Sequence, residues 1–241
     1  LHKMIIAILN EKGGAGKTTL ITNLARAYQR RGKRILLVDS DPQGSLRDWL
    51  AAAGEGGDYP AMIAMDKPAM MKDLKTAGGQ YDLVLVDGCP KSMGMIAATV
   101  TVADIVLIPV QPSGFDLWAA NSVVDLVKQR QEIADGRPRA AFVVSRQITN
   151  TRIAGEAKQA IAELGLPLFE ACTSQKIAYA QAASNGRTVL DTEPGGAAAR
   201  EIEAIADELT LDGLQRKQGK PIPVSKPKRA VLPATSGCMC W

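Results

Sequence analysis

Residues 4–20, MIIAILNEKGGAGKTTL, join an apolar run to a glycine-rich loop that ends in a lysine and two threonines. The run at residues 4–10 has the length and aliphatic content of a buried strand, and residues 17–31 follow as a helix. Glycines between a strand and a helix let backbone N–H groups converge on an anion, because no Cβ obstructs it. The positive end of the helix dipole lies at the same place. The stretch therefore predicts a phosphate-binding loop.

The side chains of this loop fit a nucleoside triphosphate with Mg²⁺. Lys17 is expected to contact the β- and γ-phosphates, and the Thr18 hydroxyl to ligate Mg²⁺. Thr19 is placed to reach the α-phosphate. Lys12 is an extra lysine that binding within one chain does not require. It is either a solvated loop residue or a group that reaches a nucleotide held by a second subunit.

Acidic residues end two further predicted strands, at residues 34–40 and 81–87. The carboxyl ends of parallel strands meet at the ligand crevice of an α/β sheet. Asp87 after an aliphatic run has the Walker B pattern, in which the carboxylate holds Mg²⁺, often through water. Asp39 and Asp41 lie at the other strand end, where the alternative interpretation is a simple turn signal before a proline.

These motifs together resemble the ParA/MinD family of deviant Walker A ATPases. KGGAGKTT at residues 12–19 is similar to the family's KGGxGK[ST], and DSDPQ at residues 39–43 is similar to its switch I. The resemblance implies that Lys12 acts across a nucleotide-sandwich dimer and that Asp41 orients the attacking water. It further implies that Asp39 supports the magnesium shell.

The segment after Asp87 resembles the small ParF-type branch of the family, where a glycine follows this aspartate. Gly88 would allow close approach of the backbone to the γ-phosphate. Cys89 is interpreted as a small buried residue rather than as the cysteine of an iron–sulfur relative. Arg146 follows a strand end that resembles the one near the nucleoside, so it is expected near the adenine. The resemblance covers residues 4–211.

The expected site is therefore an ATP or ADP site with Mg²⁺. The expected catalytic residues are Lys12, Lys17 and Asp41. The expected metal-supporting residues are Thr18, Asp39 and Asp87. The expected nucleotide-contacting residues are Lys12, Gly13, Gly14, Ala15, Gly16, Lys17, Thr18, Thr19, Asp39, Gln43, Gly88 and Arg146.

Alternating strand and helix patterns predict an α/β fold. Continuous aliphatic strands separated by helices indicate a doubly wound, mostly parallel sheet flanked by helices, which is the P-loop NTPase class. The predicted strands are residues 4–10, 34–40, 61–65, 81–87, 104–110, 140–145 and 168–171. The predicted helices are residues 17–31, 45–53, 68–77, 116–134, 151–164, 177–184 and 196–209.

The chain of 241 residues suits one such domain, at residues 4–214, with residues 1–3 interpreted as vector sequence. Six of the 29 basic residues and none of the 25 acidic ones lie from residue 215 onward. We interpret residues 215–241 as a basic, disordered tail, which either contacts a polyanion or only aids solubility. The four cysteines form no CxxC pair, and no apolar run is long enough to span a membrane. A cytoplasmic, nucleoid-associated protein is expected.

ParA-like relatives hold non-specific DNA as ATP-bound dimers, through basic side chains that neutralise phosphates. The candidate DNA contacts are Lys176, Arg200, Arg152, Lys158 and Arg187. The tail lacks the amphipathic helix of a MinD-like membrane anchor, so no membrane partner is expected. The alternative interpretation of each candidate DNA contact is an ordinary solvated residue.

The leading function is an ATPase that partitions a plasmid or chromosome segment. Its ATP-bound homodimer would bind DNA, and a ParB- or ParG-like partner would stimulate weak intrinsic hydrolysis. One alternative is the same engine positioning a protein cargo, such as a carboxysome or chemoreceptor cluster. An alternative of another class is a metabolic or metallocluster-assembly ATPase.

Overall fold

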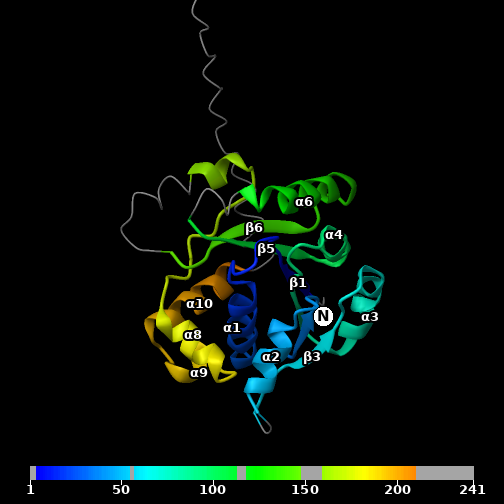
Figure 1. The fold of residues 1–241 in the computed structure, drawn as a ribbon. Coiled ribbons are helices and arrows are strands. Elements are labelled where there is room, and N and C mark those ends of the chain that lie inside the picture. Colours follow the sequence, from blue (N-terminus) through cyan, green and yellow to red (C-terminus); the bar gives the residue numbers. More distant parts are fainter. Residues whose placement is uncertain (1–3, 55–56, 113–117, 148–158, 210–241) are drawn as a thin grey trace, which may run out of the picture.

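The computed structural model describes residues 4–54, 57–112, 118–147 and 159–209. A six-stranded sheet runs through its centre in the order β3-β2-β4-β1-β5-β6, with every paired strand parallel (Figure 1). The strands are β1 Met4–Ile8, β2 Ile35–Asp39, β3 Ala61–Ala64, β4 Leu83–Asp87, β5 Ile105–Val110 and β6 Arg139–Val144. The predicted parallel, doubly wound sheet is confirmed.

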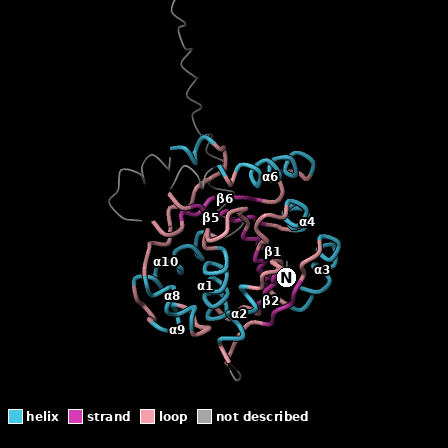
Figure 2. Tube along the Cα trace, in the orientation of Figure 1, coloured by secondary structure: helices cyan, strands magenta, loops and turns pink. Residues whose placement is uncertain are grey.

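Helices cover both faces of the sheet, as Figure 2 shows. One face carries α1 Lys17–Arg30, α2 Ser45–Ala52, α8 Ile177–Ser184, α9 Val189–Thr192 and α10 Ala197–Glu208. The other carries η1 Pro68–Asp73, α3 Leu74–Ala77, η2 Gly78–Gln80, α4 Met93–Val102 and α6 Asn121–Ile133. The described residues include no helix long and apolar enough to cross a membrane.

Alternating side chains divide each strand between two hydrophobic cores. Ile6 and Ile8 of β1 pack with α1 and α10, whereas Ile5 and Ala7 pack on the side of α4 and α6. Successive residues of a strand point to opposite faces, and both faces are covered here. This explains why the strands read as unbroken aliphatic runs in the sequence.

The winding of the chain places a crevice at the carboxyl ends of β1 and β4. These two strands are neighbours, and Ile8 is in register with Asp87. The helices that follow them, α1 and α4, lie on opposite faces of the sheet. An open α/β sheet binds its ligands where adjacent strands send their helices to opposite faces. The glycine-rich loop and Asp87 both lie at this point.

One predicted strand, at residues 168–171, is wrong. Leu168 forms an isolated bridge with Phe142 of β6, and the next bridge, Gln147 to Ser174, lies beyond both the segment and β6. Between them, the backbone N–H groups of Glu170 and Ala171 donate to the carboxylate of Glu208, at 3.1 and 2.6 Å. That side chain from the end of α10 binds N–H groups of the segment and interrupts the ladder.

Smaller differences concern helices. Residues 68–77 fold as the 3₁₀ helix η1 followed by the short α3, rather than as one helix. Helix α4 and the single-turn α9 lie in stretches where the sequence predicted no element. The predicted helix at residues 151–164 falls partly outside the described residues, and residues 159–163 are helical. Residues 1–3 and the predicted tail at residues 215–241 also lie outside the described residues.

Candidate functional site

The glycine-rich loop leaves β1 and turns sharply into α1. Gly14 and Gly16 have φ angles of +77° and +91°, in the left-handed region that strains a residue with a Cβ. The side chain of Asn10 fixes the start of the loop, because it donates to the Pro109 carbonyl at 2.7 Å and accepts the Lys12 N–H at 2.8 Å. The loop is therefore held in shape before any ligand binds.

Two side chains from neighbouring strand ends also support this loop. The Ser145 hydroxyl, after β6, donates to the Ala15 carbonyl at 2.7 Å. The Gln111 amide, after β5, donates to the Gly14 carbonyl at 3.0 Å. These bonds engage loop carbonyls, which leaves the N–H side of the loop to face an anion.

Lys17 points its ammonium back into the loop. Its side chain is buried, and Nζ donates to the Lys12 carbonyl at 3.0 Å. Burial lowers the pKa of Lys17, and the negative charges of Asp87 and Asp41 oppose that effect. A partly desolvated cation beside open backbone N–H groups is suited to phosphate oxygens.

Asp87 lies at the end of β4 with one satisfied and one unsatisfied oxygen. Its Oδ2 accepts the Thr18 hydroxyl at 2.7 Å, whereas its buried Oδ1 has no hydrogen-bond partner. Burial raises the pKa of Asp87 to about 7, although the Thr18 hydroxyl and Lys17 act in the opposite direction. A buried oxygen without a partner is costly, so this position is prepared for a cation or a water molecule.

The donor set around Asp87 fits Mg²⁺. Mg²⁺ in nucleotide sites is held by one or two protein oxygens, by phosphate oxygens and by water, rather than by a cage of side chains. Thr18 and Asp87 supply such oxygens, and the described residues contain no group of three or more His, Cys, Asp or Glu side chains that could hold a metal ion. Thr18 and Asp87 would therefore hold Mg²⁺ together with a bound nucleotide.

Asp39 differs from Asp87 because both of its oxygens are occupied. The carboxylate is completely buried, and Oδ1 accepts the N–H of Asp41 at 3.0 Å. Oδ2 accepts the backbone N–H and the Nε–H of Arg47, at 3.2 and 3.1 Å. Both Asp39 oxygens accept hydrogen bonds from the protein in this conformation, and the expected role of Asp39 in the magnesium shell stays a prediction. No motif in the sequence pointed to Arg47.

Asp41 and Gln43 lie on the loop that follows β2. The Gln43 N–H donates to Asp41 Oδ1 at 3.0 Å, which closes a tight turn. The negative charge of Asp41 also acts on Lys17 and Asp87. Asp41 therefore forms the turn before Gln43, and its expected role in orienting the attacking water stays a prediction.

The packing of β4 against β1 requires a glycine at position 88, which the sequence did not indicate. Its N–H donates to the Ile8 carbonyl at 3.0 Å, and a Cβ would lie 2.6 Å from that oxygen. The glycine thus lets the end of β4 approach β1. The expected approach to the γ-phosphate stays a prediction. Cys89 is buried and unpaired by any disulfide, and burial raises the pKa of its thiol.

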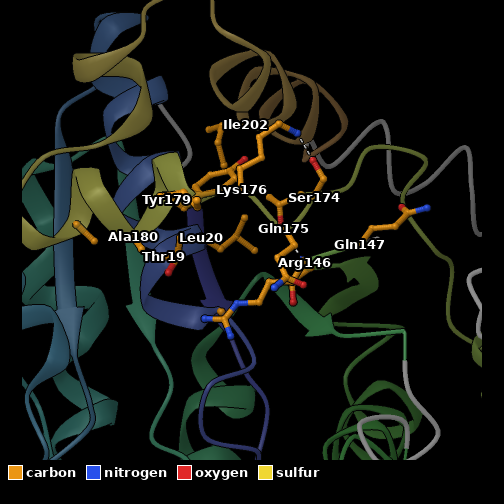
Figure 3. Close-up of a pocket in the computed structure, with 15 residues that line it drawn as sticks. Thr19, Leu20, Arg146, Gln147, Ser174, Gln175, Lys176, Tyr179, Ala180 and Ile202 are labelled. Atoms are coloured by element: carbon orange, nitrogen blue, oxygen red, sulfur yellow. Dashed lines mark hydrogen bonds between the residues drawn. The ribbon is translucent and has the colours of Figure 1, made fainter. Parts of the chain in front are cut away.

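A cavity of about 900 Å³ opens beside the phosphate loop (Figure 3). Gly16 and Thr19 form its wall on the loop side, and Arg146 and Tyr179 contribute from the chain after β6 and from α8. Its position next to the loop and its size suit the nucleoside part of a nucleotide. The expected placement of Arg146 near the adenine agrees with this geometry and stays a prediction.

The described candidate DNA contacts lie on different elements of the fold. Lys176 is half-buried in the cavity wall, where it bonds Ser174 (Figure 3). It also forms an ion pair with Glu201. Arg187 and Arg200 are exposed, on the turn after α8 and on α10. Arg152 and Lys158 lie outside the described residues.

The comparison with protein families agrees with the site. The model of the CobQ/CobB/MinD/ParA nucleotide-binding domain, CbiA, matches residues 6–189. The chain belongs to this family. The resemblance to ParA/MinD ATPases is confirmed, and nucleotide binding is the property that the whole family shares by name.

Named relatives within the family are similar over most of their length. Maintenance of carboxysome distribution protein A of Halothiobacillus neapolitanus is 32% identical, over 85% of this chain and 95% of the relative. The protein of the same name from Gloeobacter kilaueensis is 34% identical, over 88% and 96%. The chromosome-partitioning ATPase Soj of Thermus thermophilus is 29% identical, over 85% and 94%.

Solved structures show the same fold. A complex of Cyanothece McdA with ATP has a TM-score of 0.69 and 17% identity, and the match covers 93% of this chain and 99% of that one. MinD of Pyrococcus horikoshii, complexed with Mg-ADP, has a TM-score of 0.67 and 17% identity, with 87% and 97% covered. The cofactors expected here, ATP or ADP with Mg²⁺, agree with these bound groups.

The buried carboxylate of Asp87 predicts a pH-dependent stability for the nucleotide-free protein. The pKa of the folded-state carboxyl, near 7, lies above the ordinary value, so the unfolded chain ionises first and the protein loses stability as the pH rises from that ordinary value toward 7. Asp87→Asn removes this cost and is expected to stabilise the protein at pH 8 in EDTA, by up to about 4 kcal/mol, with a much smaller gain at pH 5. Urea denaturation at both pH values measures the difference.

Asp82→Asn is the matched control for that experiment. Asp82 lies on the surface, where Arg34 lowers its pKa, so its contribution is lost as the pH falls. The control should therefore show no gain at pH 8. A gain for Asp87→Asn that does not depend on pH would contradict the assigned pKa.

Proposed function

We propose that the chain is a ParA-type ATPase that positions a large cargo through cycles of ATP binding and hydrolysis. The observation that carries the proposal is the contact between Thr18 and Asp87, with an unpartnered Asp87 oxygen and a buried Lys17 beside it. Mg²⁺ in this position would neutralise phosphate charge. Lys17 would bind the phosphates, and Asp41 would orient the water that attacks the γ-phosphate.

Lys12 supports a dimeric form of this ATPase. Its backbone N–H and carbonyl shape the loop through Asn10 and Lys17, so the main chain has a role within one subunit. Lys17 already supplies a buried ammonium to the phosphate site. A second lysine at the loop entrance fits the cross-subunit contact that the family motif implies, in which ATP closes a sandwich dimer.

The choice of cargo rests on the relatives. Two proteins named for carboxysome distribution are 32% and 34% identical over nearly their whole length, which favours a protein assembly as cargo. The similarity to Soj supports chromosome or plasmid partition as the second candidate. Both candidates use a cytoplasmic, DNA-associated dimer and a partner that stimulates hydrolysis, either a cargo adaptor or a ParB- or ParG-like protein.

A metabolic or metallocluster-assembly ATPase is the alternative of another class. Cys89 is buried in the hydrophobic core on the α4 side of the sheet, and Cys172 packs against the same core. These positions favour the switch ATPase over a cluster carrier. A measurement of ATP turnover without any small acceptor substrate would distinguish the switch ATPase from a metabolic enzyme.

Replacing Lys12 tests the dimer. Lys12→Ala is expected to abolish ATP-dependent dimerisation, because a cross-subunit ammonium is lost, while Mg²⁺-ATP still binds the monomer. Light scattering with ATP measures the mass, and Lys33→Ala, an exposed lysine after α1, is the control. Full dimerisation of Lys12→Ala would show that the proposed role of this lysine is wrong.

DNA retention tests the use of a nucleoid surface. The ATP-bound protein should shift a non-specific duplex at low salt and release it as salt rises, because counterions are displaced on binding. Arg187→Ala and Arg200→Ala should each weaken the shift and reduce its salt dependence, whereas Arg34→Ala should not. The absence of any shift at low salt would overturn the DNA-associated mechanism for either cargo.

A further inference from the structure

Arg47, in the first turn of α2, folds back over the loop that joins β2 to α2. Its Nε donates to the carboxylate of Asp39 at 3.1 Å, and its Nη2 donates to the carbonyls of Asp41 and Pro42 at 2.9 and 3.2 Å. Gly44 makes room for it, since a Cβ there would lie 2.9 Å from Nε. One guanidinium thus holds a strand end and the following loop together.

The ion pair between Arg47 and Asp39 has one fully buried partner and one partly exposed partner. The Asp39 side chain is completely buried, whereas 38% of the Arg47 side chain is exposed. A buried carboxylate requires a counter-charge and hydrogen bonds, and Arg47 provides both to Asp39. Arg47 therefore anchors on a fixed point at the end of β2, and the carbonyls that it binds are fixed relative to that point.

The loop held in this way carries Asp41. The Asp41 carbonyl accepts from Arg47 and from the Gly44 N–H, and its carboxylate accepts the Gln43 N–H. Asp39 at the start of this loop is in register with Asp87, and the charge of Asp41 acts on Lys17, so the loop lies at the phosphate end of the site. A small displacement of a catalytic group costs much of its effect on the reaction rate.

We infer that Arg47 is a positioning residue for hydrolysis, which holds the switch loop so that Asp41 lies against the phosphate site. The inference rests on the proposed ATPase function and adds the residue that holds the loop carrying Asp41 in place. The fork of the guanidinium matters, because a lysine ammonium on a flexible stem cannot serve Asp39 and both carbonyls with the same geometry.

Steady-state phosphate release by the full chain tests the inference through Arg47→Lys and Arg47→Ala. Arg47→Ala is expected to lower kcat about tenfold or more while KM for Mg²⁺-ATP changes less than about twofold, because the binding loop is untouched. Arg47→Lys should recover part of kcat, since it restores the charge beside Asp39. Arg34→Lys and Arg34→Ala, at an exposed pair with Asp82, are matched controls and should match the unaltered protein.

Removing Arg47 leaves a buried charge, so a variant with both Asp39→Asn and Arg47→Ala keeps the experiment valid if Arg47→Ala does not fold. Hydrogen exchange of the Asp41, Gln43 and Gly44 amides in the nucleotide-free protein gives a readout besides activity. Both variants should exchange faster there than the unaltered protein, without a change in the central strands.

The outcomes separate the inference from the proposed function. An unchanged kcat with unchanged exchange of the Asp41, Gln43 and Gly44 amides overturns the role of Arg47. A loss of kcat that accompanies faster amide exchange in every strand shows that Arg47 only stabilises the fold, and this result also overturns the inference. An unaltered protein that neither binds nor hydrolyses ATP removes the proposed function and the kinetic role with it, while the exchange data still decide whether Arg47 holds the loop.

Discussion

The Thr18 hydroxyl donates a hydrogen bond of 2.7 Å to Asp87, and this contact joins the first turn of α1 to the end of β4. It depends on the sheet register, in which Ile8 and Asp39 are both aligned with Asp87. Three parallel strands therefore end at one level, where the glycine-rich loop, the switch loop and the β4 carboxylate meet. The two hydrophobic cores hold that register from both faces.

The two buried carboxylates at this level have different tasks because they have different partners. Asp87 keeps an oxygen without a partner, which suits a cation that arrives with the nucleotide. Asp39 is neutralised by Arg47 and organises the loop that carries Asp41. Both aspartates are buried, but Asp87 keeps an oxygen without a partner, whereas the protein supplies hydrogen-bond donors to both oxygens of Asp39.

Much of this site could be predicted from the sequence because a phosphate loop requires glycines at positions of positive φ and a positively charged side chain beside the phosphates. Gly14, Gly16, Lys17, Thr18 and Asp87 occur where the motif requires them, and the structure brings Thr18 and Asp87 into contact. The central strands were equally predictable, because burial on both faces demands continuous aliphatic runs. Helix α4 was missed because an apolar helix has no polar face to give a period of 3.6 residues.

The remaining features depend on contacts between distant residues. Glu208 reaches from α10 to the N–H groups of Glu170 and Ala171, which no local pattern could indicate. The space that Gly88 leaves for β1 follows from sheet packing. Arg47 looks like an ordinary polar helix residue in the sequence, and only the fold places it over Asp39. Residue patterns thus predicted which chemical groups form the site, whereas the hydrogen bonds and packing that hold these groups in place depend on the tertiary structure.

The central claim is that Thr18 and Asp87 form a magnesium–nucleotide site beside Lys17. Calorimetric titration of the full chain with ATP, in Mg²⁺ and then in EDTA, tests it most directly. The account predicts clearly tighter binding of ATP in Mg²⁺ than in EDTA, and no such difference for Thr18→Val. Equal ATP affinity in Mg²⁺ and in EDTA for the unaltered protein would contradict it.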